Sequence, residues 1–365
     1  MSEYKKAEPI KEYYIAYFDL LGYKNFFQSY PNEVANFLQM IHEAISSTNT
    51  YIQSVNKSPI GAEIGNLFIR TKMFSDNVLL CLKISAASIE YLRFLAFLSI
   101  IADIQRNFVL KYGLFLRGGI TIGKLSFNDD FVFGQGLIDA VALEEKAIYP
   151  RIVMDKPVLD YVFQPHFVKP DDLEKACEIE KRAHAGEYIS DEELAFCNSI
   201  KPITDMERIY LHWRDNLLFP VADGVIVLNY LYYINICEIL GKTVVQKMQD
   251  LLKELSPNDY QKFGNFDPDQ KQRLIDHKAR IIQKIKEFGK YDDIFDAKDA
   301  DIRERILKKY IWALSFHNLV CIKYDHPDCM IKSGSTFDIR FMKMTVEILE
   351  DNPPEVMQQE ENRNE

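Results

Sequence analysis

The sequence predicts an α+β fold, with a ferredoxin-like βαββαβ core over residues 10–155 and an α-rich extension packed on that core over residues 156–349. In the core, apolar runs and amphipathic stretches alternate in the order strand, helix, strand, strand, helix, strand. After Asp155 the chain becomes more charged and helix-forming. Because 47% of the 365 residues are hydrophobic, the chain can build a substantial core. Residues 350–365 are polar and are expected to be disordered.

Local patterns define the first half of the core. Residues 13–18 (YYIAYF) are aromatic and apolar, which predicts a buried strand. Residues 33–55 carry one apolar stripe and predict a helix. Two strand-like runs follow, residues 67–74 (LFIRTKMF) and 78–84 (VLLCLKI). The residues SDN between them favour a turn, so these two runs are expected to form a hairpin.

The second half of the core continues the alternation. A long helix is predicted over residues 86–112, and Gly113 is expected to end it. Residues 114–123 (LFLRGGITIG) predict the next strand. The stretch 134–147 (GQGLIDAVALEEKA) opens with glycines and then has a helical pattern, and residues 151–155 (RIVMD) predict a short strand.

This topology should bring two acids together at one edge of the sheet. In the ferredoxin-like plan the first and third strands are antiparallel, so the end of the first lies beside the start of the third. Asp19 ends the first strand and Asp76 precedes the third. Two carboxylates repel each other unless a cation lies between them, and hard divalent ions prefer such oxygen ligands. We therefore expect Asp19, Asp76 and the backbone carbonyl of Leu20 to bind two Mn²⁺ or Mg²⁺ ions. Taken singly, each aspartate also fits an ordinary turn or cap residue.

Capping and apolar patterns describe the extension. Ser190 and Glu193 form a capping-box pattern, which favours a short helix. Residues 208–238 are strongly apolar and must be buried. Another helix is predicted over residues 301–323. Three further side chains are interpreted as packing residues: Trp213, Trp312 and His317.

Composition and charge exclude several functions. The net charge of −10 leaves no broad basic face for a nucleic-acid backbone, so no nucleic-acid partner is expected. No apolar run approaches the length of a membrane span, and the N-terminus has no secretory apolar region. The six cysteines form no CxxC pair and have no zinc spacing, which is typical of reduced thiols in the cytosol. We therefore expect a cytoplasmic protein that does not engage a membrane.

Four motifs, in order along the chain, resemble those of class III nucleotidyl cyclases. YFDLLGY is similar to their D-x-x-G-[FY] metal motif, and KMFSD to their K-x-x-[GS]-D segment. LRGGITIG is similar to their R-x-G-I strand, and FGQGLIDAVALEEKA to their G-x-x-V-N-x-A-x-R-L-E helix. The resemblance spans residues 13–155. It implies that Asp19 and Asp76 hold the metal and that Lys72 contacts the base.

One branch of this family is more similar still. YFDLLGYKNFF, SDNVLL, LRGGI, YPRIVMD and, in the extension, KYIWALSFHN resemble the pyrimidine cyclases of bacterial antiphage Pycsar systems. This resemblance implies conversion of UTP or CTP to the 3′,5′-cyclic monophosphate and pyrophosphate, dependence on Mn²⁺, and a separate effector protein that reads the product. It also implies a C₂ homodimer with composite active sites. Tyr23 joins Lys72 as a candidate for base recognition.

The sequence departs from the family where the triphosphate is expected to bind. The family's transition-state asparagine falls on Ile138 and its arginine on Ala142, and neither side chain can donate a hydrogen bond to a phosphate. Other cations must therefore face the triphosphate, and three candidates are available: Arg117, Lys146 and Arg151. Each of them also fits a solvated charge or an ion pair at the sheet edge.

Three other functions compete with the cyclase. A phosphatase related to haloacid dehalogenases needs a second acid two residues after its nucleophile, where this chain has Leu21. A palm-type dinucleotide synthase would carry a GGDEF-like hairpin, which SDN does not match. A catalytically inactive nucleotide-binding or dimerisation module fits Ile138 and Ala142. A cyclic monophosphate formed together with pyrophosphate would separate the cyclase from the others.

Overall fold

The computed structural model describes most of the predicted core and parts of the extension. The described residues are 9–21, scattered positions between 35 and 57, 67–85, 90–128, 131–163, 170–197, 210, 213–221, 223–232, 269–289 and 300–331. The described positions between 35 and 57 are all helical, as predicted for residues 33–55. The predicted disordered tail, residues 350–365, lies outside the described residues.

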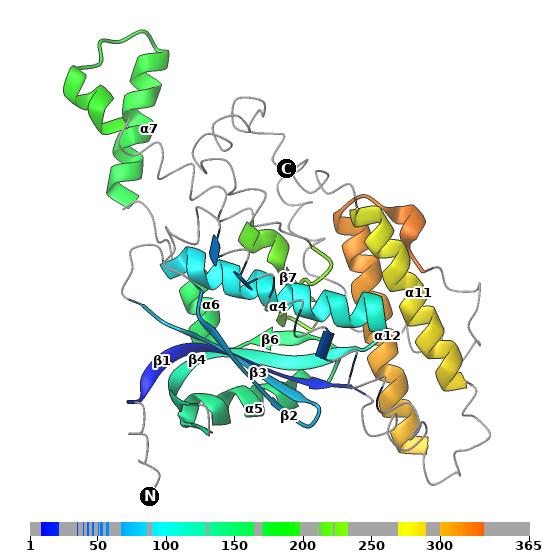
Figure 1. The fold of residues 1–365 in the computed structure, drawn as a ribbon. Helices are drawn as coiled ribbons and strands as arrows, with labels where there is room; N and C mark the ends of the chain where they lie inside the picture. The colour runs from blue at the N-terminus through cyan, green and yellow to red at the C-terminus, as the bar shows by residue number, and fades with distance from the viewer. Residues whose placement is uncertain are drawn as a thin grey trace, which may run out of the picture.

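One mixed sheet forms the centre of the structure (Figure 1). Its strands are β1 (Lys11–Leu20), β2 (Ile69–Phe74), β3 (Asn77–Lys83), β4 (Leu116–Phe127), β5 (Val132–Phe133), β6 (Ile152–Met154), β7 (Leu218–Pro220) and β8 (Ile226–Leu228). Their order is β2-β3-β1-β4-β6-β8-β7, and the short β5 pairs with β4. β1 is antiparallel to both β3 and β4, whereas β4 and β6 are parallel. The predicted antiparallel pairing of the first and third strands is therefore confirmed.

The sheet continues beyond the predicted end of the core at residue 155. β8 pairs antiparallel with β6, and β7 pairs antiparallel with β8. The extension is thus not only helical, because it adds two strands to the same sheet. The sequence predicts that this apolar stretch is buried but does not reveal its strands. Each strand has only three residues, too few to show an alternation of period two.

Two helices of the core cover opposite faces of the sheet, α4 (Glu90–Tyr112) and α5 (Gln135–Ala147) (Figure 1). Side chains of β1 alternate between these faces, as the pleat of a strand requires. The even-numbered residues from Tyr14 to Leu20 belong to the core cluster that includes α4, whereas Tyr13 and Ile15 belong to the smaller cluster on the α5 side. Asp19 has the parity of Tyr13 and Ile15, so it lies on the α5 face.

The predicted stop of the long helix is also present. Gly113 has φ +65°, and its N–H donates to the carbonyl of Val109 over 2.9 Å. This left-handed conformation carries little steric penalty for glycine, which has no Cβ. The helix therefore ends where the chain must turn towards β4.

Two glycines of β4 allow α5 to lie close to the sheet. A Cβ at Gly119 would lie 2.7 Å from the side chain of Leu143. A Cβ at Gly123 would lie 2.5 Å from the Cα of Gly136. Ordinary carbon contacts are about 3.5–4.0 Å long, so only glycine fits at this separation. The close approach brings Glu144, the residue after Leu143, down onto the sheet.

Four α-helices of the extension lie within the described residues. They are α6 (Lys156–Phe163), α7 (Pro170–His184), α11 (Gln270–Gly289) and α12 (Ala300–Lys323). Arg280 of α11 ties the extension to the core, because its guanidinium donates to the carbonyls of Leu110 and Lys111 at the end of α4. None of the described helices is both long and apolar enough to cross a bilayer.

The packing roles predicted for three side chains are confirmed. Trp213 is buried, and Trp312 stacks on Phe316. His317 is buried, with its Nδ1 3.1 Å from the Nδ1 of His277 and its Nε2 3.1 Å from the carbonyl oxygen of Cys329. Burial lowers the pKa of both imidazoles, to about 4 for His317. His317 is therefore a hydrogen-bonded core residue.

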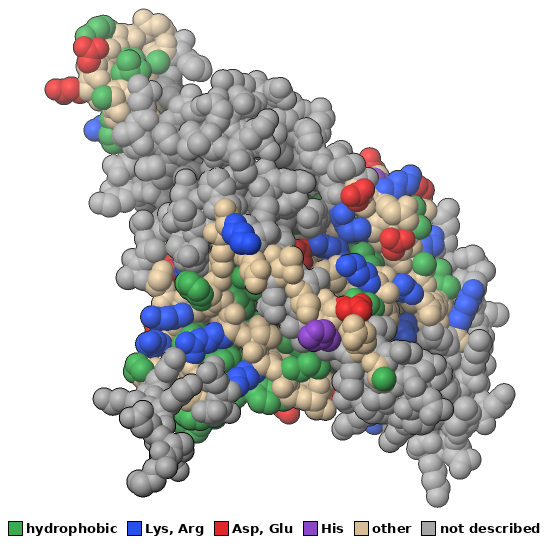
Figure 2. All heavy atoms as spheres, viewed as in Figure 1, with side chains coloured by type: hydrophobic (Ala, Val, Ile, Leu, Met, Phe, Trp, Pro, Cys, Tyr) green, Lys and Arg blue, Asp and Glu red, His purple; other side chains and the backbone are tan. Residues whose placement is uncertain are grey.

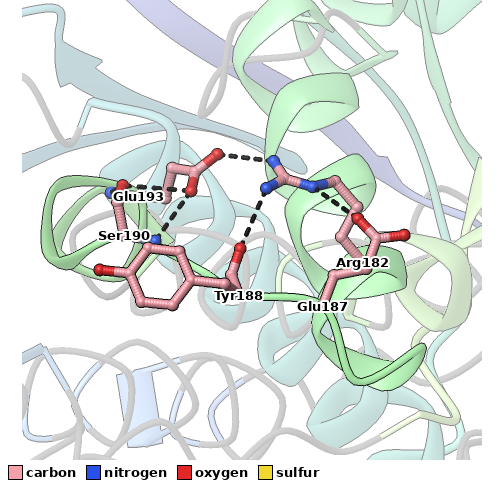
Figure 3. Close-up of polar contacts among 5 residues, drawn as sticks. All are labelled: Arg182, Glu187, Tyr188, Ser190 and Glu193. Atoms are coloured by element: carbon pink, nitrogen blue, oxygen red, sulfur yellow. Dashed lines mark hydrogen bonds and ion pairs between the residues drawn. The ribbon is translucent and has the colours of Figure 1, made fainter.

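The predicted capping box at Ser190 is present as well (Figure 3). The N–H of Ser190 donates to Glu193 over 2.9 Å, and the N–H of Glu193 donates to the hydroxyl of Ser190 over 3.2 Å. Arg182 of α7 pairs with Glu193 and with Glu187. These contacts fix the turn between α7 and the short helix 191–197.

Substitution of Gly123 by alanine should displace α5 from the sheet. The new methyl group would meet backbone atoms of Gly136, which cannot move aside as a flexible side chain would. We expect the free energy of unfolding to fall by about 1–3 kcal/mol, measured by urea denaturation. Lys124→Ala, at the exposed neighbouring position, is the control and should change it by less than about 0.5 kcal/mol. A Gly123→Ala protein as stable as the wild type would contradict this packing.

Candidate active site

The structure brings the two predicted aspartates together at the end of β1. In the β1–β3 register Asp19 lies opposite Asn77, the residue after Asp76. The N–H of Leu20 donates to the carbonyl of Asp76 over 3.0 Å, which fixes the hairpin turn against the end of β1. Ser75 adopts φ +58° in this turn. The meeting of the two acids at one sheet edge is therefore confirmed, while their roles as metal ligands stay a prediction.

The environment of Asp19 penalises its charged form. Burial raises the pKa of Asp19 above its ordinary value, and the Asp76 carboxyl group raises it further. Arg117 and Lys309 act in the opposite direction, because they attract the carboxylate. The net shift is upwards, so these two cations do not fully compensate for burial and repulsion. Such a site favours the binding of additional positive charge.

Arg117 joins Asp19 to a third acid. It lies directly opposite Asp19 in the β1–β4 register, and one guanidinium nitrogen is 3.3 Å from the carboxylate of Asp19. The same nitrogen is 2.5 Å from Glu144 of α5, whose side chain is only 7% exposed. Burial raises the pKa of Glu144, whereas Arg117 lowers it. From the sequence it was open whether helix 134–147 reaches Asp19 within one chain, and the structure brings them together.

Lys309 of α12 is a site residue that sequence analysis did not identify. It interacts electrostatically with Arg117, Asp19 and Glu144, although the sequence separates it from all three. Only its place in KYIWALSFHN, directly before Tyr310, marks it in the sequence. The extension therefore contributes a cation to the rim that holds the two aspartates.

Two other predicted cations lie in different surroundings. Arg151 is buried, with one guanidinium nitrogen 2.6 Å from Asp223 and its Nε donating to the carbonyl of Ala147 over 3.0 Å. Lys146 is exposed on α5, two positions after Glu144. Helix positions two apart do not face the same side, so Lys146 points away from the face that carries Glu144. Among the described residues, neither Lys146 nor Arg151 forms a hydrogen bond or ion pair with Asp19 or Asp76.

The residues predicted to read the base are placed in part. Lys72 is half-buried on β2 opposite Leu79, which packs on the α5 side of the sheet. Cross-strand neighbours share a face, so Lys72 lies on the same face as Asp19. Tyr23 lies outside the described residues. Ile138 is 62% exposed on α5, and Ala142 is exposed too, so both apolar side chains stand where the resembling family carries donors.

Asp19 and Asp76 fit a hard divalent ion by ligand type and by their unbalanced charge. The fit is limited to a pair of carboxylates, since within the described ranges no cluster of three or more His, Cys, Asp or Glu side chains is arranged for a metal. Glu144 is engaged by Arg117 instead. Any further ligands would have to be the Leu20 carbonyl, water or a bound phosphate, as is usual for Mg²⁺.

Comparisons with known proteins bear on the fold. No protein-family model and no curated protein matches the sequence. Among solved structures, the chain is similar to the adenylyl cyclase CyaB from P. aeruginosa, with 14% identity, a TM-score of 0.33, and coverage of 42% of this chain and 81% of that chain. A class III adenylyl cyclase-like ATP-binding protein from Pseudomonas aeruginosa has 12% identity, a TM-score of 0.30, and coverage of 44% and 37%.

An adenylate/guanylate cyclase/hydrolase from Silicibacter pomeroyi has 18% identity and a TM-score of 0.27, covering 45% of this chain and 88% of its own. The structural similarity to class III adenylyl and guanylyl cyclases thus extends over less than half of this chain. The activities in these names belong to those proteins.

Substitution of Arg117 by glutamine should destabilise the metal-free protein in a pH-dependent way. Arg117 lowers the pKa of both Asp19 and Glu144, so its loss raises both values further in the folded state. The penalty applies only when the carboxyl groups are ionised. We expect a loss of about 1–3 kcal/mol at pH 7 that disappears as the pH falls below the ordinary values of 3.8 and 4.5.

Urea denaturation across this pH range measures the effect, and Arg117→Lys is the matched control. The lysine keeps the positive charge but cannot bridge two carboxylates with a planar guanidinium, so it should recover part of the loss. A destabilisation of equal size at pH 3 and pH 7 would show that Arg117 acts by packing alone.

Proposed function

We propose that this chain is a metal-dependent pyrimidine nucleotide cyclase that converts UTP or CTP to the 3′,5′-cyclic monophosphate and pyrophosphate. The observation that carries the proposal is the convergence of Asp19, at the end of β1, and Asp76, in the turn between β2 and β3, at a rim with Arg117. Carboxylates whose charge is penalised by burial are typical of functional sites. The motif resemblance to class III cyclases supports the choice of reaction.

The chain's own residues would divide the work as follows. Asp19 and Asp76 would hold Mn²⁺ or Mg²⁺, and such ions lower the pKa of the ribose 3′-hydroxyl and offset phosphate charge when bound. Arg117 holds Asp19 and Glu144 in fixed positions, so the acids need not reorganise when substrate arrives. Lys72, on the same sheet face, can donate a hydrogen bond to a pyrimidine carbonyl. Positioning supplies most of the acceleration in phosphoryl transfer.

The biological role that we propose is antiphage signalling in the bacterial cytoplasm. The resemblance to Pycsar cyclases supports this role, in which a separate effector protein reads the cyclic product. UTP and CTP differ by one carbonyl-to-amine exchange. Lys72 can donate to uracil O4 or to the O2 of either pyrimidine, so both UTP and CTP are compatible with it.

A catalytically inactive nucleotide-binding or dimerisation module is the alternative. Ile138 and Ala142 favour it, since both occupy the α5 positions at which the resembling cyclases carry transition-state donors. Under this alternative the protein would bind a nucleotide without releasing pyrophosphate. Measurement of pyrophosphate release therefore distinguishes the two functions.

Incubation of the protein with each of the four common ribonucleoside triphosphates and Mn²⁺ tests the proposal. We expect pyrophosphate and a cyclic monophosphate from UTP or CTP, identified by mass spectrometry. Asp19→Asn and Asp76→Asn should each lower the rate by about 10²–10⁴-fold, because a metal ligand contributes several kcal/mol to the barrier. Asp139→Asn, an exposed acid of α5, is the control and should retain activity.

Two results would contradict the cyclase. Binding of a nucleotide without turnover would favour the inactive module, and a linear dinucleotide would favour a palm-type synthase. Full activity of both Asn variants would remove the two aspartates from the mechanism.

We further propose a C₂ homodimer in which Lys72 of one subunit serves the aspartates of the other. Within one chain Lys72 lies two strands away from β1, a separation of roughly 10 Å at the usual spacing. A mixture of inactive Asp19→Ala and Lys72→Ala proteins should then regain activity through hybrid dimers with one intact site. Rates after subunit exchange measure this, with each variant alone as the control. No recovery from an exchanged mixture would show that both residues act within one chain.

A further inference from the structure

Helix α12 is clamped against the rim that holds the aspartates. The ring of Tyr310 lies edge-on to Phe115, with centroids 6.0 Å apart. Phe115 directly precedes β4, and its carbonyl accepts the N–H of Leu21 over 2.9 Å. Two residues further on, Trp312 stacks on Tyr149, with centroids 6.1 Å apart. Figure 1 shows α12 beside the sheet, next to α11. These contacts hold α12 against the ends of the strands that carry Asp19 and Arg117.

Lys309 precedes Tyr310 and is half-buried. Its ammonium group interacts electrostatically with Asp19 of β1, Arg117 of β4 and Glu144 of α5, and also with Arg305 of its own helix. No ion pair or hydrogen bond joins it to another residue of the described ranges, so it is near the cluster without being neutralised by one partner. A lysine placed in this way can contact an anion that enters the rim.

The site needs such a cation, given the other residues around it. Ile138 and Ala142 cannot contact a phosphate, and Arg151 is engaged by Asp223. Lys146 points away from the sheet. Arg117 remains, and its Nε is buried without a hydrogen-bond partner. Lys309 and Arg117 are thus two described cations that interact with Asp19.

We propose that Lys309 of the C-terminal extension contacts the triphosphate of the substrate together with Arg117, within the same chain, and replaces the donors that α5 lacks. This inference rests on the proposed cyclase function. It makes the extension a part of the active site rather than an appended domain. The ligand that Lys309 would contact is a polyphosphate, and this contact does not depend on the base of the nucleotide.

Binding of inorganic tripolyphosphate to the full chain, followed by isothermal titration calorimetry, tests this contact without turnover. We expect Lys309→Gln to weaken binding by about tenfold or more, as the loss of a charge-assisted hydrogen bond predicts. Lys309→Arg should retain most of the affinity. Lys286→Gln, which removes an exposed lysine of α11, is the matched control and should bind as the wild type does. Circular dichroism checks that each variant is folded.

Turnover provides a second readout that separates this inference from the cyclase. With an active wild type, Lys309→Gln should lower kcat/KM for the triphosphate by about tenfold or more, and UMP binding should not change. Wild-type affinity of Lys309→Gln for tripolyphosphate, or an unchanged kcat/KM, would overturn the inference while leaving the cyclase intact. Lys309-dependent binding in a protein that turns over no triphosphate would overturn the cyclase and leave the contact standing. A wild type that neither binds tripolyphosphate nor turns over any triphosphate would overturn both.

Discussion

The register of β1 with its two neighbours is the constraint on which the site depends. It places Asp19 opposite Arg117 on one side and beside the Asp76 turn on the other. A slip of one residue would turn Asp19 to the α4 face, among apolar side chains. The apolar alternation along β1 therefore does two things at once. It buries the strand on both faces, and it leaves the carboxylate of Asp19, near the end of the strand, facing α5.

The charge cluster at this rim is costly to the fold on its own. Burial and mutual repulsion raise the pKa of Asp19, and burial raises that of Glu144, despite the cations beside them. A purely structural cluster would be expected to balance its charges, because unpaired buried charge destabilises a protein. Sites that retain such a penalty are typically kept for function, where an incoming ligand supplies the missing charge.

Sequence patterns predicted the elements that depend on local chemistry and on topology. The hairpin around SDN, the stop at Gly113 and the meeting of Asp19 with Asp76 follow from turn formers, glycine and strand order. The ion pair of Arg117 with Glu144 depends instead on how closely α5 packs, which spacing along the chain does not encode. The strands β7 and β8 are too short to show a period. Lys309 reaches the rim through tertiary contacts of α12, although it lies far from Asp19 in the sequence.

Lys309 also changes how Ile138 and Ala142 should be interpreted. Their apolar side chains suggest an inactive protein only if α5 must supply the donors for the triphosphate. In this structure α5 contributes a buried carboxylate, Glu144, and the cations come from β4 and α12. A charge on α12 can serve the site only while its aromatic residues stay packed against Phe115 and Tyr149. The electrostatics of the rim therefore depend on how the extension packs. Under the proposed function, the absence of donors at Ile138 and Ala142 does not by itself imply an inactive protein.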